Sequence, residues 1–149
     1  MGSRWQASLL RLFEGPRAHR GTKLLDLGCA MGRFLQMAAT AGFWCTGLEL
    51  SGAAASATRA LGFPVVESAL QYARPAGQDI VTAWDFLEHV TDLRGTLAKV
   101  RTIVKKGGCF LFATPDGGSA RAQEHGERWI CLNSSMEHIT YLTEPFLQQ

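Results

Sequence analysis

Apolar and polar residues alternate along the chain in blocks that predict strands and helices in turn. The block at 23–51 begins with an apolar run at 24–27, which is typical of a buried parallel strand. After a turn at 28–32, apolar residues recur at helical spacing until Gly42, which is placed to end a helix. A second apolar run at 43–48 predicts the next strand. Strand, helix and strand in this order predict a βαβ unit, whose crevice lies at the carboxyl ends of its strands.

The rest of the chain repeats this alternation and predicts an α/β fold. The predicted helices lie at 3–14, 52–61 and 93–105, and a last one begins after Thr143. The predicted strands lie at 63–66, 78–83 and 109–113. Ser51 is expected to cap the helix at 52–61, and the pair Thr91-Asp92 the helix at 93–105. The stretch 117–128 is too rich in glycine and charge for a strand, and we expect a loop there.

Composition indicates the general class of protein but does not indicate a binding partner. A chain of 149 residues suffices for one domain with one core, and a net charge of +2 favours no particular ligand. Its 4 cysteines lack C-x-x-C spacing, so neither a disulfide framework nor a zinc site is expected. No apolar run approaches the roughly 20 residues of a membrane span, and the beginning of the chain lacks the apolar region of a signal peptide. We therefore expect a cytoplasmic protein.

The turn at 28–32 and an acidic residue beyond it carry the candidate chemistry. Gly28 lets the backbone turn sharply, and the small residue Ala30 lets a ligand approach the main chain. Glu49 follows about 20 residues later, where an acidic side chain can accept hydrogen bonds from both hydroxyls of a ribose. Gly32 comes one residue earlier than the last glycine of the dinucleotide pattern G-x-G-x-x-G.

The segments DLGCAMG at 26–32 and GLELS at 47–51 resemble the first motif and the acidic post-motif of class I S-adenosylmethionine-dependent methyltransferases. The resemblance implies that the first segment lines the methionine half of S-adenosylmethionine and that Glu49 holds its ribose. The cofactor-binding residues implied in these segments are Asp26, Gly28, Cys29, Ala30, Gly32, Glu49 and Leu50. The family usually has glycine where Ala30 stands, and alanine is tolerated there if its dihedrals stay in a region open to L-residues.

Two later segments extend the resemblance over residues 22–116. DIVTAWDFLEHV at 79–90 is similar to a signature of the branch that includes ubiquinone-pathway O-methyltransferases, and the passage at 97–116 is similar to the block that follows in that family. The resemblance implies a Rossmann-like, doubly wound parallel sheet with strand order 3-2-1-4-5. The antiparallel hairpin that ends the full fold is missing from this chain.

Three residues are implied in holding the adenine or the sulfonium. Trp84 emerges at the carboxyl end of the fourth strand, where its ring can flank the adenine or the sulfonium. Aromatic faces favour cations, which suits the sulfonium; the less favoured alternative is a core or lid aromatic. Ser68 and Ala69 follow the third strand, where the family often reads adenine with an aspartate. Either the serine hydroxyl or a backbone contact would replace that aspartate.

Asp85, Glu88 and His89 lie at i, i+3 and i+4, on one side of a helical turn. Such groups can bind a hard cation, as in some ubiquinone-pathway relatives, or can position the loop; we expect no metal. His89 is a candidate general base, although many methyl transfers need only alignment and desolvation. The segment 129–141 resembles a substrate-side loop of the branch, which makes His138 a second catalytic candidate.

We expect a single methyltransferase-like domain over 1–149. Residues 1–21 form a leading helix and connector, 22–116 the cofactor-binding core, and 117–149 a substrate-side loop and the start of a helix. The chain is expected to be the core of a longer protein or a naturally short variant. Its fifth strand is then an exposed edge, through which two copies could form a homodimer.

The expected function is S-adenosylmethionine-dependent methyl transfer to a small-molecule acceptor, at oxygen rather than nitrogen or carbon. The alternative is a non-catalytic S-adenosylmethionine-binding or scaffold domain. A nicotinamide-dependent oxidoreductase is disfavoured by the glycine spacing. No nucleic-acid partner is expected, because the chain has neither a basic stripe with interleaved aromatics nor the N-P-P-[YF] signature.

Overall fold

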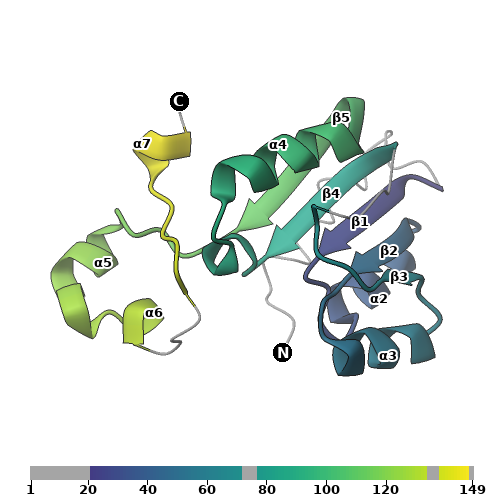
Figure 1. The fold of residues 1–149 in the computed structure, drawn as a ribbon, viewed down its shortest axis with the longest axis horizontal. Helices are drawn as coiled ribbons and strands as arrows, with labels where there is room; N and C mark the ends of the chain where they lie inside the picture. The colour runs from purple at the N-terminus through teal and green to yellow at the C-terminus, as the bar shows by residue number, and fades with distance from the viewer. Residues whose placement is uncertain (1–20, 72–76, 134–137, 148–149) are drawn as a thin grey trace.

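A single parallel sheet organises the chain, which a computed structural model describes over residues 21–71, 77–133 and 138–147 (Figure 1). The sheet has five strands in the order β3-β2-β1-β4-β5. The strands are β1 (Lys23–Leu27), β2 (Trp44–Leu48), β3 (Val65–Val66), β4 (Gln78–Trp84) and β5 (Val104–Ala113). This confirms the predicted α/β fold and strand order. The predicted helix at 3–14 lies outside the described residues.

Helices cover both faces of the sheet. The α-helices are α2 (Arg33–Thr40), α3 (Gly52–Ala60), α4 (Leu93–Ile103), α5 (Ala120–His125), α6 (Ile130–Asn133) and α7 (Glu144–Leu147). Two short 3-10 turns, η1 (Leu87–His89) and η2 (Gly126–Arg128), complete the set. The predicted caps of α3 and α4 are confirmed, since Ser51 Oγ accepts from Ala54 N and Asp92 Oδ1 accepts from Gly95 N.

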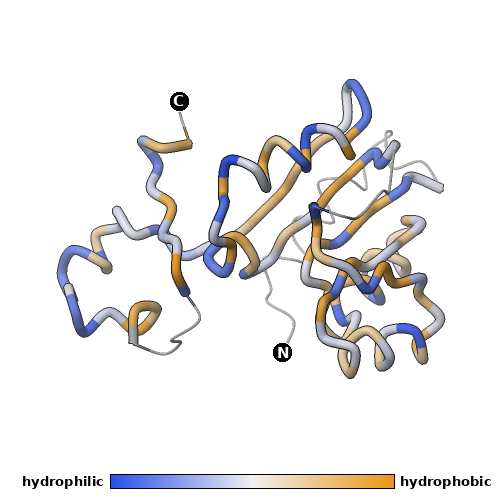
Figure 2. Tube along the Cα trace, viewed as in Figure 1, coloured by the Kyte–Doolittle hydropathy of each residue, from blue (hydrophilic) through white to orange (hydrophobic). Residues whose placement is uncertain are grey.

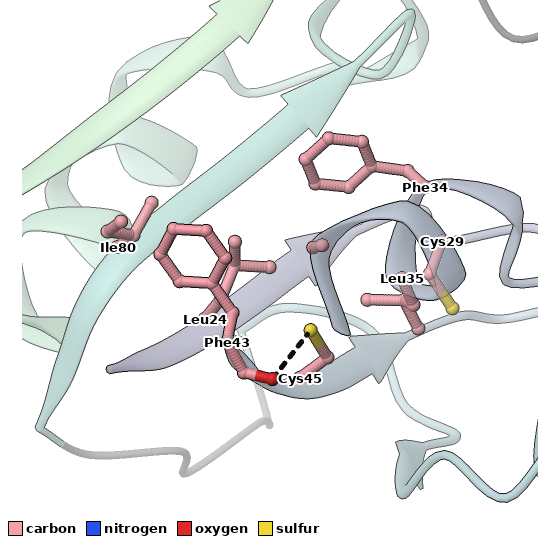
Figure 3. Close-up of a cluster of buried hydrophobic side chains, with 8 residues drawn as sticks. Leu24, Cys29, Phe34, Leu35, Phe43, Cys45 and Ile80 are labelled. Carbon is pink, nitrogen blue, oxygen red and sulfur yellow. Dashed lines mark hydrogen bonds between the residues drawn. The ribbon is translucent and has the colours of Figure 1, made fainter. Parts of the chain in front are cut away.

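The strands divide their side chains between two cores because neighbouring residues point to opposite faces. On one face, Leu24 and Ile80 pack with Phe34 and Leu35 of α2 (Figure 3). On the other, Leu25 and its neighbours pack with α4; the buried members are Leu25, Leu27, Leu48, Leu70, Val81, Ala83, Val100 and Ile103. Burial on both faces explains why the strands read as continuous apolar runs rather than as alternating ones.

The boundary between α4 and β5 differs from the prediction. The helix was expected to continue to Lys105 and the strand to begin at Cys109, but α4 ends at Ile103 and β5 already begins at Val104. Val104 has extended dihedrals (φ −71°, ψ 132°), and Lys105 Nζ lies 2.8 Å from Asp79 Oδ1 of β4. The sheet register shifts at this point. The lysines and glycines therefore form an irregular strand start, not a helix end.

The polar stretch 117–128 was predicted as a loop and instead contains α5 and η2. Ser119 caps α5, since its Oγ accepts from Ala122 N at 3.2 Å. Figure 1 shows α5 and α6 beside the sheet, past the end of β5, and Figure 2 shows mainly hydrophilic and neutral residues along α5 and η2. The chain then returns to the segment that follows β5, where Leu142 forms an isolated bridge with Asp116.

One edge of the sheet is β5, and the other is the short strand β3. Within the part of the chain that the structure describes, β5 pairs with β4 alone, so an exposed edge is present as predicted and dimerisation through it stays a prediction. No helix in the described ranges combines the length and the apolar character that a membrane crossing requires.

Candidate functional site

A pocket of about 1040 Å³ opens at the carboxyl ends of the strands, the edge to which the arrows of β1, β4 and β5 point in Figure 1. Its wall includes seven residues that the sequence singled out: Gly28, Ala30, Glu49, Leu50, Ala69, Asp85 and His89. Ligands of open parallel sheets bind at this edge. The structure thus gathers most of the ribose-side and turn candidates around one cavity.

The carboxylate of Glu49 joins the two turns that border the pocket. Its Oε2 accepts from Ala30 N at 3.0 Å, and its Oε1 accepts from Ser51 N at 2.8 Å. Each oxygen of an ionised carboxylate has room for about two hydrogen bonds. Both oxygens can therefore hold the turns and still accept from a ligand hydroxyl.

Gly28 is required at its position for two reasons. Its φ of +67° is in the left-handed region that favours glycine, and a Cβ there would meet the Phe86 ring at 2.8 Å. Its N–H donates to Leu48 O at 2.8 Å, and Cys29 N donates to the same carbonyl at 3.1 Å. The turn after β1 is therefore fastened to the end of β2 before any ligand arrives.

Ala30 does not satisfy the condition stated for alanine at this position, because its dihedrals lie in the left-handed region that favours glycine. Its φ is +46°, which costs an L-residue roughly 1–2 kcal/mol. Two contacts hold it in this conformation: its N–H donates to Glu49, and its carbonyl accepts from Thr58 Oγ1 at 2.7 Å. Tertiary hydrogen bonds thus compensate for the absence of the family's usual glycine.

Asp26 lies beneath the turn, outside the pocket wall. Its side chain is buried, and its Oδ1 accepts from Thr82 Oγ1 of β4 at 2.6 Å. Burial raises the pKa of Asp26 to about 7, against the opposing effect of the hydrogen bond from Thr82. The carboxyl group therefore ties β1 to β4 and stays largely protonated in mildly acidic solution.

Cys29 and Gly32 also face the interior. Cys29 packs so closely on Gly47 that a Cβ on that glycine would collide with its sulfur. Burial, with smaller contributions from Asp26 and Glu49, raises the pKa of the Cys29 thiol to about 11, so it stays protonated and unreactive. Gly32 begins α2 with a φ of +75°. Both residues therefore stabilise the turn on the side that faces the core, away from the pocket.

Trp84 and Ser68 also lie outside the pocket wall. Trp84 is half-buried and meets Phe34 edge-on, with ring centroids 5.0 Å apart, in the core beneath α2. The Ser68 hydroxyl donates to Ala69 O at 3.2 Å. Their implied contacts with adenine or sulfonium stay predictions.

The acidic and histidine candidates divide into two groups. Asp85 is exposed, has a φ of +49° and lines the pocket. Glu88 is fully buried, and its Oε2 accepts from Thr114 Oγ1 at 3.0 Å. His89 lines the pocket and meets the ring of His138 edge-on at 4.9 Å. The structure therefore places Glu88 and His89 close to His138, a residue from the C-terminal part of the chain.

The sequence did not indicate the wall that α4 contributes. Phe86 and the start of α4 line the pocket, and the residues concerned are Phe86, Val90, Thr91, Asp92, Gly95, Thr96 and Lys99. Phe86 could have been found, because it lies two residues beyond the carboxyl end of β4. The α4 residues could not, because exposed polar positions on a helix look alike whether they face a pocket or solvent.

A family model described as a methyltransferase domain matches residues 1–149. The ubiquinone biosynthesis O-methyltransferase of Aromatoleum aromaticum is 36% identical over 103 residues, which make up 63% of this chain and 44% of that protein. The chain spans about half the length of the curated relatives it matches.

Solved structures show the same architecture. An S-adenosylmethionine-dependent methyltransferase from Mesorhizobium loti superposes with a TM-score of 0.63 at 26% identity, over 73% of this chain and 53% of that one. The YcgJ protein of Bacillus subtilis superposes with a TM-score of 0.81 over 98% of this chain and 65% of that one. Its 13% identity makes it evidence for the fold alone.

Replacing Ala30 by glycine should stabilise the protein. Glycine removes the left-handed strain of roughly 1–2 kcal/mol but loses about 0.5–1 kcal/mol because it has more conformational entropy in the unfolded state. We therefore expect a net gain of up to about 1.5 kcal/mol. The matched control is Ala57→Gly on the exposed side of α3, which should lose about 1 kcal/mol. Chemical denaturation measures both variants. Equal losses in the two would contradict the strained conformation of Ala30.

The buried carboxyl group of Asp26 should make stability depend on pH. Its folded pKa of about 7 exceeds the ordinary 3.8, so between these values the folded state keeps a proton that the unfolded state has lost. The free energy of unfolding should therefore fall as the pH rises through this window, by roughly 4 kcal/mol in total, and then level off.

The variant Asp26→Asn should remove this decline, because an amide stays neutral and can still accept from Thr82. Denaturation in urea at several pH values from mildly acidic to mildly alkaline tests the expectation. Asp85→Asn, which neutralises an exposed carboxylate, should keep the wild-type slope. If Asp26→Asn loses stability with pH as steeply as the wild type, Asp26 is not the group responsible.

Proposed function

The chain belongs to the methyltransferase domain family, whose model matches its whole length, and from this premise we propose that it transfers a methyl group from S-adenosylmethionine to a small-molecule acceptor. The family match confirms the expected enzyme class and its cofactor. The acceptor, the atom that is methylated and the residues that act on it are parts of the proposal.

The observation that carries the proposal is the position of Glu49 on the pocket wall. Its carboxylate already holds the turn at Ala30 and the start of α3 at Ser51, and it has acceptor capacity left for two vicinal hydroxyls. A ribose offers such a pair, and the adjacent turn leaves its backbone open to a ligand because residues 28 and 30 are small. The cavity, the acceptor oxygens of Glu49 and the accessible backbone of the turn therefore fit a nucleoside-containing cofactor.

When bound, S-adenosylmethionine would supply a methyl group on a sulfonium sulfur: a nucleophilic atom of the acceptor would bond to the methyl carbon in line as the carbon–sulfur bond breaks, and the demethylated cofactor would leave with the electron pair. The work of this chain is to bind and to orient. Glu49 and the turn after β1 fix one end of the cofactor, while the apolar side chains of Leu50, Phe86 and Val90 displace water from the cavity. Excluding water also prevents loss of the methyl group to solvent.

An oxygen acceptor is favoured by similarity to the ubiquinone biosynthesis O-methyltransferase of Aromatoleum aromaticum, which covers 63% of this chain. The side of the pocket formed by α4 carries Asp92, Thr96 and Lys99, which can donate to or accept from a polar small molecule. Together these features favour a hydroxylated small molecule as the acceptor.

Calorimetric titration of the purified full chain with S-adenosylmethionine, with its demethylated product and with NAD tests the cofactor. We expect the first two to bind and NAD not to bind. Binding of NAD alone would overturn the proposal, as would failure of a demonstrably folded chain to bind any of the three. A chain that binds the cofactor is then incubated with hydroxylated aromatic acceptors and radiolabelled methyl donor, and transfer separates an enzyme from a binding domain.

Removing the carboxylate in Glu49→Ala should weaken S-adenosylmethionine binding by about 1–3 kcal/mol, because ribose donors lose their acceptor. The control is Thr58→Val, which removes the other hydrogen bond that holds Ala30 and lies outside the pocket wall. Calorimetry should find a clearly smaller loss in this control. If both variants bind equally weakly, Glu49 acts only by holding the turn, and its assignment to the ribose is wrong.

A further inference from the structure

Lys99 differs from every other cationic side chain of the described chain. It is half-buried, whereas all the other described lysines and arginines are exposed. The exposed ones are Lys23, Arg33, Arg59, Arg94, Arg101, Lys105, Lys106, Arg121 and Arg128. Lysine is rarely buried without an anionic partner. The Lys99 ammonium group nevertheless forms neither an ion pair nor a hydrogen bond with any residue that the structure describes. Its charge is therefore left for a ligand.

Lys99 lies on the wall of the pocket, on the side that α4 contributes. Asp92, Thr96 and Lys99 are four and three residues apart, so they share one face of the helix. A rise of about 1.5 Å per residue puts Lys99 roughly 10 Å beyond Asp92 along the helix axis. The helix lies beside β4 and β5, whereas Glu49 follows β2, on the other side of β1 (Figure 1). The pocket thus has Glu49 on one side and Lys99 on the other.

The acidic residues of the pocket wall do not neutralise Lys99. Glu49 accepts from two backbone N–H groups, and Asp92 Oδ1 accepts from Gly95 N at 2.9 Å. Asp85 is exposed and follows β4 directly. Thr96, one turn before Lys99, adds a half-buried hydroxyl group that can donate a hydrogen bond. This end of the pocket is therefore suited to an anion.

The pocket has room for a second molecule beside the cofactor. Cavities that hold one drug-sized ligand measure about 300–1,000 Å³, and this one measures about 1040 Å³. Because Glu49 is assigned to the ribose of the cofactor, the space that remains lies toward α4. Phe86 and Val90 also line the pocket and offer apolar contacts to the body of such a molecule.

We propose that the methyl acceptor carries an anionic group, a carboxylate or a phosphate, and that Lys99 selects it. This inference rests on the proposed function, since it takes the molecule on the α4 side to be the acceptor. The ammonium group of Lys99 pairs with the anion, and the Thr96 hydroxyl donates to it. A half-buried pair is screened by salt much less than a surface pair, so it discriminates an anion from a neutral analogue. Lys99 determines specificity and takes no part in the transfer itself.

Pairs of ligands that differ only in charge test the proposal. The full chain, saturated with the demethylated cofactor to prevent turnover, is titrated calorimetrically with 4-hydroxyphenylacetate, 4-hydroxycinnamate and 4-hydroxyphenyl phosphate. The neutral amides of the two carboxylates are titrated in parallel. We expect saturable binding of an acid, and binding of its amide to be weaker by roughly 10- to 100-fold, which is the worth of a hydrogen bond to a charged group. The tighter acid tells a carboxylate site from a phosphate site.

A lysine can also be half-buried because its aliphatic stem covers apolar surface. Lys99→Met separates the two roles, because methionine keeps a stem of similar length and lacks the charge. It should bind the acids as weakly as the amides, while Lys99→Arg should keep most of the acid binding. The matched control is Arg101→Met, which removes an exposed cation of the same helix outside the pocket wall and should bind the acids like the wild type.

Four results would overturn the proposal: no saturable binding of any acid, equal binding of acids and amides, wild-type acid binding by Lys99→Met, or an equal loss in Arg101→Met. The cofactor is titrated into the same variants. If Lys99→Met binds S-adenosylmethionine more weakly than the wild type, Lys99 holds the carboxylate of the cofactor, and its assignment to the acceptor is wrong.

The two proposals fail in distinguishable ways. If the unaltered chain binds the acids through Lys99 but binds no S-adenosylmethionine, the proposed methyl transfer falls and an anion site remains. If the chain binds S-adenosylmethionine and the acids bind no better than the amides, methyl transfer stands and the acceptor is not selected by charge.

Discussion

The pocket depends on one carboxylate that accepts hydrogen bonds from two backbone N–H groups. Glu49 ends β2, and its oxygens accept from Ala30 in the turn after β1 and from Ser51 at the start of α3. Such charge-assisted hydrogen bonds are roughly twice as strong as neutral ones. A glutamine could not replace both contacts, because its amide group donates where an acceptor is needed. The two turns are therefore held as one unit, with the negative charge left at the mouth of the cavity.

The turn after β1 has a ligand side and a support side. Gly28 and Ala30 border the cavity, while Cys29 lies against Gly47 in the core. Asp26 lies deeper still and binds Thr82 across the sheet. From the sequence, the whole motif at 26–32 was expected to line the cofactor. Because neighbouring residues of a turn face opposite ways, only part of it can touch a ligand, and the rest sets the shape of the part that does.

Most of the fold could be predicted from the sequence, because both faces of the sheet are buried and each strand is a continuous apolar run between glycine-bearing turns. The end of α4 could not be placed, because the lysines at 105 and 106 suit a helix end as well as they suit a strand beside Asp79. The helix α5 was missed because its charged residues bury little, and its stability comes from the cap at Ser119.

The site was predictable where a residue's function follows from its position at a strand end, as for Glu49 and Gly28. The group formed by His138 and Glu88 was not, because 50 positions separate the two in the sequence, and only the return of the chain brings them together. The left-handed conformation of Ala30 was missed for a related reason. Contacts from Glu49 and Thr58 impose it, and both lie far along the chain.

The segment after β5 has little hydrophobic core of its own, so contacts with the rest of the domain must hold it in place. Among its described residues the buried side chains are few, namely Ala122, Trp129 and Leu142. It hydrogen-bonds to the turn at 88–90 through the backbone of Glu88 and the carbonyl of Val90. Val90 also lines the pocket. Whatever stabilises the buried carboxylate of Glu88 therefore stabilises one wall of the cavity and the docking of the C-terminal segment together, so a disturbance at either should be felt at the other.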